Sequence, residues 1–163
     1  MPEWVTHALL GLLVAEIFSV RKKSIVVLGA LLPDMIIKLT LLRLFIPIPN
    51  FDYAILGAFH TPFPLLLFTI LISPLFRYDH LTIIAWLNLG ALTHFLSDAL
   101  LRHLGSGGVR LLYPFTAKYY TLGLIWPDDT LWIGLATAIL YFGVIAFKKI
   151  ILPRIHHGTA TSR

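Results

Sequence analysis

The residues best suited to chemistry are His94 and Asp98, which lie four positions apart inside a long hydrophobic run. Four residues make about one helical turn, so both side chains point from the same face of a helix. An imidazole and a carboxylate together form a ligand set that Zn²⁺ and similar divalent metals accept. His7, Asp34 and His60 add three groups of the same kind on other apolar segments. The pattern predicts a membrane protein built around a metal site.

Each of these groups also has an ordinary structural interpretation. A lone histidine in an apolar helix is more often a packed, hydrogen-bonded residue than a ligand, and His94 and Asp98 can simply bond to each other. Asp34 can pair with Lys38 one turn later. The number of groups favours a shared site, because three histidines and two aspartates at membrane depth are costly unless they serve a common purpose.

Composition places the chain in a membrane. Of its 163 residues 58% are hydrophobic and 13% are charged, whereas a soluble domain carries about 25% charged residues. At about 20 residues per crossing, this length allows roughly four or five helices. The absence of cysteine excludes disulfides, thiolate ligands and cysteine nucleophiles. The net charge of +5 lies at segment ends, which the positive-inside rule explains without a nucleic-acid partner.

We therefore expect an all-α fold, a polytopic membrane helical bundle of about five transmembrane segments. The bundle forms a single domain over residues 1–152, followed by a polar cytoplasmic tail over residues 153–163. Three segments are the strongest candidates because they are long and almost uncharged, and they cover residues 53–76, 81–101 and 130–147. The other two cover residues 4–20 and 24–46. Pro33 lacks a backbone donor, so we expect the second segment to be broken or kinked there, with Asp34 facing the protein interior.

The basic residues predict an orientation. Arg21, Arg77 and Lys148 fall on one side if all five segments cross. We therefore expect a multi-pass protein of the cell (inner) membrane, with its amino terminus outside and its carboxyl terminus in the cytoplasm. The first three residues lack the basic start of a secretory signal, so the first apolar run is expected to remain as a span. At about 1.5 Å per residue, four of the five candidate ligands then fall in the outer half of the bilayer.

The motifs resemble a known family. They are Thr6-His7 with Gly11, residues 29–34 ending in Pro33-Asp34, His60-Thr61, and Gly90 followed by Thr93-His94 and Asp98. This set resembles the membrane-bound metal-dependent hydrolases, whose bacterial members include the LexA-regulated, SOS-induced group. The order of the motifs is also similar to that in zinc-dependent phospholipase C and the related all-helical nuclease fold. The resemblance covers residues 6–114 and omits the last segment.

The resemblance implies a site and a reaction. One or two divalent ions, Zn²⁺ by the resemblance, would be bound by histidine nitrogens and aspartate oxygens. The aspartates could bridge two ions. The implied ligands are His7, Asp34, His60, His94 and Asp98. Asp34, His94 and Asp98 would be catalytic, with Ser97 and Asn88 orienting the ligands. The implied reaction is hydrolysis of a phosphoester, and the membrane setting favours a lipid or lipid-linked substrate.

One departure from the family leaves its chemistry open. The family often has a His-Arg-Gly-x-x-His-Ser stretch, and alignment of its last histidine with His60 places Ile55 and Leu56 at the His-Arg positions. The chain can therefore have a one-metal site, an altered substrate, or no catalytic activity.

Two further classes compete with a hydrolase. The same five residues could form an ion or proton pathway in a transport protein, with Glu16 as its continuation, or a structural metal site in a non-catalytic subunit.

The segment after the fourth span carries Arg102, Arg110 and Lys118, which could bind an anionic headgroup or only face the solvated membrane surface. The sequence leaves the oligomeric state open.

Overall fold

The computed structural model describes residues 4–45, 53–102 and 108–151, and it confirms the all-α class. The predicted tail, the loop over residues 46–52 and the glycine-rich break at 105–107 lie outside the described residues. The α-helices are α1 (Trp4–Ile17), α2 (Lys23–Lys38), α3 (Pro62–Ile72), α4 (His80–Leu100) and α5 (Thr130–Ala146). Short helices continue or join them: η1 (Leu39–Leu44), η2 (Tyr53–Phe59), η3 (Ser73–Leu75), η4 (Pro127–Asp129) and η5 (Phe147–Ile151), the last of π type.

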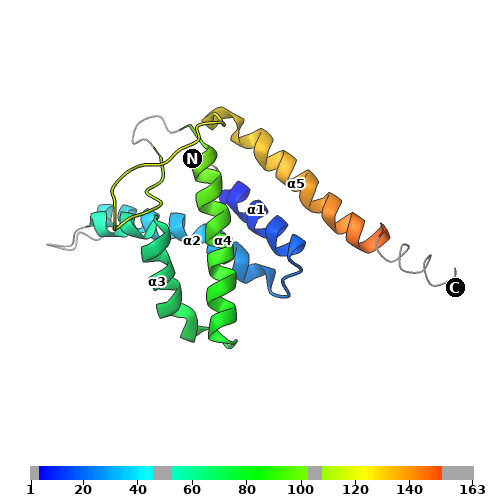
Figure 1. Cartoon of the computed structure of the whole chain (residues 1–163), viewed down its shortest axis with the longest axis horizontal. Coiled ribbons are helices and arrows are strands. Elements are labelled where there is room, and N and C mark those ends of the chain that lie inside the picture. Colours follow the sequence, from blue (N-terminus) through cyan, green and yellow to red (C-terminus); the bar gives the residue numbers. More distant parts are fainter. Residues whose placement is uncertain (1–3, 46–52, 103–107, 152–163) are drawn as a thin grey trace.

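Helix α4 is the central element of the bundle. It packs against α1, α2 and α3, while α5 packs on α1. Figure 1 shows α4 upright with α3 beside it, and α5 running obliquely in the same direction as α1. At the start of α4 the Asp79 carboxylate accepts bonds from the Thr82 backbone N–H and hydroxyl, both at 2.8 Å. These bonds to the charged form hold the pKa of Asp79 below its ordinary value.

Two glycines bring α2 and α4 into backbone contact. A Cβ atom on Gly29 would collide with the carbonyl oxygen of Leu87, and one on Gly90 would collide with that of Val26. Small residues at a helix crossing allow such close approach within a membrane. Because Asp34 and His94 follow these glycines by about one turn, the crossing places α2 and α4 so that both side chains reach the same interior.

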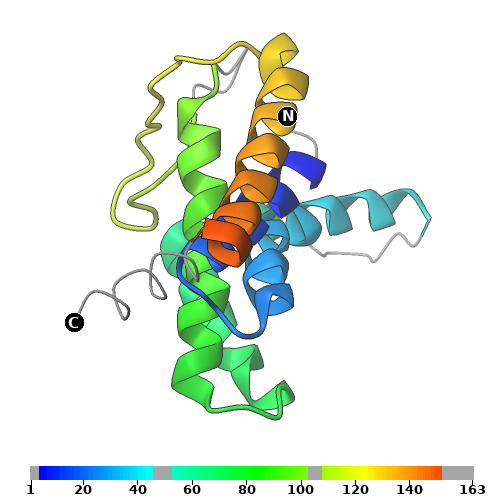
Figure 2. The same ribbon diagram turned by 90° about the vertical axis from the view of Figure 1, so that its right-hand side faces the viewer.

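Pro33 does not end its helix. Helix α2 continues through this buried proline to Lys38, so the predicted break is wrong. A proline removes one backbone donor and frees the carbonyl four residues earlier, a loss that a protein-lined interior can accommodate. Figure 2 shows that the first part of α2 and its continuation into η1 run in different directions.

Three helices are long and apolar enough to cross a membrane, and they cover Lys23–Leu41, His80–Leu100 and Pro127–Ile150. The shorter apolar helices are Trp4–Ile17 and Pro62–Leu75. The uncharged run over residues 53–76 is therefore not the single span expected from its composition. Thr61 is extended, with φ −142° and ψ 148°, before Pro62 opens α3. A residue before proline avoids the helical region, and this divides the run into η2 and α3.

A cluster of charged side chains connects the end of α1, the start of α2 and the segment just after α5. Lys23 of α2 pairs with the Glu16 carboxylate of α1. Lys148, just beyond α5, lies 3.7 Å from the other Glu16 oxygen and donates to the Ser19 hydroxyl at 2.8 Å. Glu16 is thus held between two lysines at one end of the bundle.

Candidate metal centre

The structure brings all five sequence-predicted ligands together from four elements. His7 comes from α1, Asp34 from α2, His60 from the residue after η2, and His94 and Asp98 from α4. Their nitrogen and oxygen atoms form two groups of three that could hold a metal ion, and the atoms in each group lie within 4.8 Å of one another. Four of the five residues are buried, and His60 is partly exposed. The structure thus places the five predicted residues close together.

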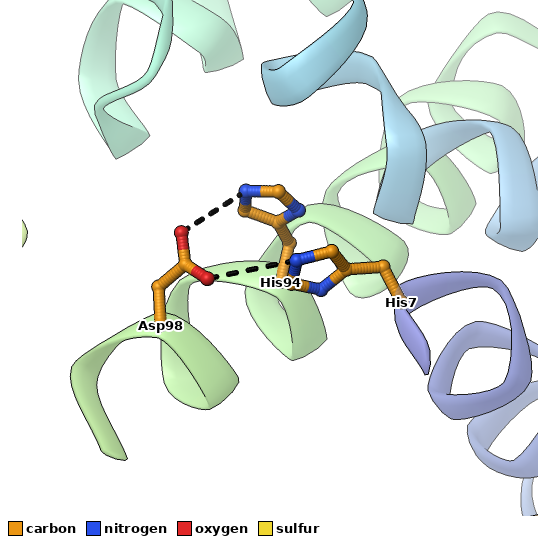
Figure 3. A group of neighbouring side chains, drawn as sticks. All are labelled: His7, His94 and Asp98. Atoms are coloured by element: carbon orange, nitrogen blue, oxygen red, sulfur yellow. Dashed lines mark ion pairs between the residues drawn. The ribbon is translucent and has the colours of Figure 1, made fainter. Parts of the chain in front are cut away.

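Asp98 lies at the centre of the cluster. One carboxylate oxygen, Oδ1, is 3.6 Å from Nε2 of His7. The other, Oδ2, is 3.3 Å from Nε2 of His94 and 3.4 Å from Nε2 of His60. Figure 3 shows the imidazoles of His7 and His94 on the same side of this carboxylate. A single aspartate thus faces three imidazole nitrogens.

The orientation of His94 is set by a backbone group of α2. Its Nδ1 lies 2.8 Å from the carbonyl oxygen of Ala30. A carbonyl can only accept, so Nδ1 carries the hydrogen and donates it, and in the neutral ring Nε2 keeps a lone pair. Metal-binding histidines are commonly held in this way by their second nitrogen. The Nε2 of His94 therefore faces the cluster as a ligand atom, 3.0 Å from Nε2 of His60.

His7 is held in the same manner by Ser97. The Ser97 hydroxyl donates to the carbonyl oxygen of His94 at 2.8 Å, so its single hydrogen is used and its oxygen accepts from Nδ1 of His7 at 3.1 Å. The His7 and His94 rings stack with centroids 4.0 Å apart and an angle of 25° between their planes. Nε2 of His7 therefore presents a second lone pair toward Asp98. This geometry agrees with the expectation that Ser97 orients one of the candidate ligands.

Asp34 joins the cluster rather than pairing with Lys38. Its Oδ1 lies 3.6 Å from Nε2 of His60, and Lys38 lies instead over the ring of Trp4, with Nζ 4.1 Å from the ring centroid. Asp34, His60 and His94 form one of the two groups of potential ligands, and His7, His94 and Asp98 form the other. His94 belongs to both, so the two groups adjoin one another.

The donor set fits a divalent cation. Two imidazole nitrogens with lone pairs and two carboxylates converge on one buried region, where a positive ion would stabilise all of them. Mixed histidine nitrogen and aspartate oxygen are the ligands that Zn²⁺ uses in catalytic sites.

Four other predicted residues lie away from this arrangement or serve other contacts. Arg102 lies over the Trp126 ring at 4.2 Å and Lys118 lies 5.8 Å from that of Tyr120. Arg110 lies 5.4 Å from the ring centroid of Tyr113. Asn88 was expected to orient a ligand, and this expectation is not supported. Its amide donates to the Thr69 hydroxyl at 2.7 Å and to the carbonyl of Ile84 at 2.8 Å, and so links α3 to α4.

Sequence reasoning missed two determinants of the site. The Ala30 carbonyl that orients His94 belongs to a backbone group and has no side-chain signal. The Gly29 and Gly90 crossing did have a signal, since both glycines belong to the motifs that contain Asp34 and His94. A glycine about one turn before each ligand could have predicted that these helices touch.

The fold and the site define a helical membrane protein with a buried cluster of histidines and aspartates. The chain belongs to the YdjM inner membrane protein family, whose model matches residues 1–156. No curated protein and no solved structure matches the chain. The family match covers α5 as well as the motif-bearing helices, so it extends beyond the resemblance seen in the motifs.

Proposed function

We propose that this protein is an integral-membrane, metal-dependent hydrolase that cleaves a phosphoester carried by a lipid. The observation that supports the proposal most directly is the convergence of His7, His94 and Asp98 with Asp34 and His60. Two of the imidazoles are held through Nδ1 by groups outside the cluster, the Ala30 carbonyl and the Ser97 hydroxyl, and their Nε2 atoms are directed inward to Asp98. The phosphoester comes from the family resemblance, and the lipid from the membrane setting.

When bound, a divalent metal lowers the pKa of coordinated water to about 7 and polarises a phosphoryl oxygen. In the proposed reaction water adds to phosphorus, the ester P–O bond breaks, and the leaving alcohol oxygen takes up a proton. Asp98 supplies the negative charge at the centre of the cluster. Asp34 lies beside His60, the most exposed member, where a carboxylate can accept the proton from the attacking water and return it to the leaving oxygen.

The positions of Ile55 and Leu56 are consistent with a five-residue ligand set. Ile55 is exposed and Leu56 packs against the apolar core around Phe95. Neither adds a ligand, so within the described part of the chain the site consists of the five groups already named. If these groups hold a metal without any hydrolysis, the chain is instead a subunit with a structural metal.

A transport pathway has less support. It would require polar groups from the cluster to the opposite end of the bundle. The buried side chains between them in the described part of α2 and α4 are apolar, and include Ile25, Val26, Ile83 and Leu87. Glu16, the expected continuation, is bound to two lysines at the far end.

Metal analysis tests the proposal. Purified wild-type protein should hold one or two divalent ions per chain, measured by plasma mass spectrometry, and should release inorganic phosphate from phosphatidic acid. His94→Ala combined with Asp98→Ala should lose both properties. His80→Ala is a matched control, because His80 is an exposed histidine of the same helix, outside the cluster. Full metal retention and hydrolysis in the double variant would overturn the proposal.

A further inference from the structure

An apolar groove of about 630 Å³ lies beside the cluster, between α3 and α4. Its walls are made mainly by aromatic and aliphatic side chains of these helices and of the loop that follows α4, including Phe63, Leu66, Leu92, Phe95, Leu112 and Phe115. Among the residues that the structure describes, none that lines the groove is charged. A charged or sugar-bearing group would lose its hydration in such a space, whereas a hydrocarbon chain would not.

The groove adjoins the cluster through the Phe95 side chain. Phe95 forms part of its wall, and the Phe95 ring lies 6.0 Å from the His60 ring and 5.6 Å from the His94 ring, measured between centroids. Pro62, another lining residue, follows His60 by two positions. A ligand that extends from the groove would therefore reach the cluster on the His60 side.

The direction of the groove matches that of a lipid tail. Helix α4 is one of the candidate membrane spans, and His94 and Asp98 lie toward its Leu100 end. From Phe95 and Leu96 the groove extends back along α4 to Asn88, near the middle of the span. Between Asn88 and Leu96 the helix rises about 12 Å. A lipid in the leaflet that contains the cluster would likewise point its acyl chain from its headgroup toward the bilayer centre.

The loop after α4 covers the end of the groove nearest the membrane surface. Leu112, Tyr113 and Phe115 line it there, and the Phe115 ring packs edge-on against Phe63 of α3 with centroids 5.5 Å apart. The side of the groove between α3 and α4 faces outward, since Leu66 and Leu92 are 36% and 53% exposed. This arrangement leaves a lateral entrance from the bilayer.

We propose that the groove between α3 and α4 binds an acyl chain of the lipid substrate, which enters sideways from the membrane and places its phosphoester at the cluster. This inference rests on the proposed function, because it assigns the substrate class of that site. The same groove would set the preference for chain length. Leu66 lines the groove from α3 and Leu112 lines it from the loop after α4, so a larger side chain at either position would reduce the space.

Photolabelling tests the groove without relying on catalysis. The probe is phosphatidic acid with a diazirine near the end of one acyl chain, incorporated with the full-length protein into phospholipid vesicles, and labelled peptides are identified by mass spectrometry. We expect labels concentrated on the groove walls, and their loss in Leu66→Trp. Leu67→Trp is the matched control: Leu67 is 52% exposed on the same helix and does not line the groove. Labels spread evenly over all lipid-facing helices, α5 included, would overturn the inference.

Activity gives a second and separate measurement. Leu66→Trp should lower kcat/KM for long-chain phosphatidic acid relative to a short-chain analogue by about tenfold or more, and Leu67→Trp should not. Leu112→Trp provides the same test from the loop if Leu66→Trp fails to fold. Groove labelling without hydrolysis would reject the proposed reaction but retain the groove. Hydrolysis with unchanged chain preference in both groove variants would reject the groove and retain the reaction.

Discussion

The hydroxyl of Ser97 on α4 lies 3.1 Å from Nδ1 of His7 on α1. This contact joins the two helices at the cluster and fixes which nitrogen of His7 faces Asp98. Ser97 also donates to the carbonyl of the preceding turn at His94. Ser97 is not one of the potential ligands, yet its hydroxyl can control the orientation of the His7 ring.

Ser97→Ala should weaken metal binding by about 10–100-fold, which is typical for loss of a group that orients a ligand. The fold should survive, because only one hydroxyl is removed. Competition with a chromophoric chelator measures the change. Thr93→Ala is the control, since Thr93 also donates to a carbonyl of its own helix, that of Gly90. Equal metal affinity in Ser97→Ala and wild type would contradict the assigned role.

Asp34→Asn should cut metal affinity and hydrolysis sharply, whereas Lys38→Met should change both little. The reason is that Asp34 lies against His60 and Lys38 lies over Trp4. If Lys38 were the true partner of Asp34, Lys38→Met would leave an uncompensated buried charge and cost about 3–5 kcal/mol of stability. Metal content and thermal unfolding, measured together on both variants, separate the two cases.

Gly90→Ala should destabilise the protein and reduce its metal content, because the added methyl would meet the carbonyl oxygen of Val26. Overpacking of this kind costs about 1–3 kcal/mol, occasionally more. Gly143→Ala is the matched control, as a Cβ atom there has no neighbour within 4 Å. Thermal unfolding in detergent should show a lower midpoint for Gly90→Ala than for Gly143→Ala. Equal midpoints would mean that the helices readily move apart.

Removal of metal should lower the unfolding midpoint of wild-type protein, and added Zn²⁺ should restore it. A ligand that binds only the native state stabilises it by about 2.7 kcal/mol at a free concentration of 100 times Kd. The variant with both His94→Ala and Asp98→Ala should not respond to chelator or Zn²⁺. A midpoint that is insensitive to chelation in the wild type would argue for an ion-free hydrogen-bonded cluster.

The predicted orientation can be tested across α4. Tyr78 lies just before α4, and the Leu122 N–H donates to the Ala99 carbonyl at the other end of this helix. A cysteine can be introduced at either position, and the chain has no cysteine of its own to interfere. We expect a membrane-impermeant thiol reagent to reach Leu122→Cys from outside and Tyr78→Cys only after the membrane is permeabilised. Labelling of both from the same side would mean that α4 does not cross.

Helical periodicity predicted those parts of the site that depend on the spacing of residues along one helix. The four-residue separation of His94 and Asp98 placed both on one face of a helix, and α4 closely matches the predicted segment over residues 81–101. The failures arose where backbone chemistry competes with hydropathy. The uncharged run over residues 53–76 predicted one span, although Pro62 divides it. Pro33 predicted a break, although α2 continues through it. The partners across the bundle, such as Ala30 with His94, depend on tertiary contacts.

The close approach of Gly29 and Gly90 also bears on how the site fluctuates. Where side chains separate two helices, their distance changes whenever a side chain adopts another rotamer. Here backbone atoms meet directly, and a peptide unit has no rotamers to exchange. Motions of the surrounding lipid and of the loosely packed α5 should therefore reach the cluster strongly damped, and the distance between Asp34 and His94 should vary less than distances elsewhere in the bundle.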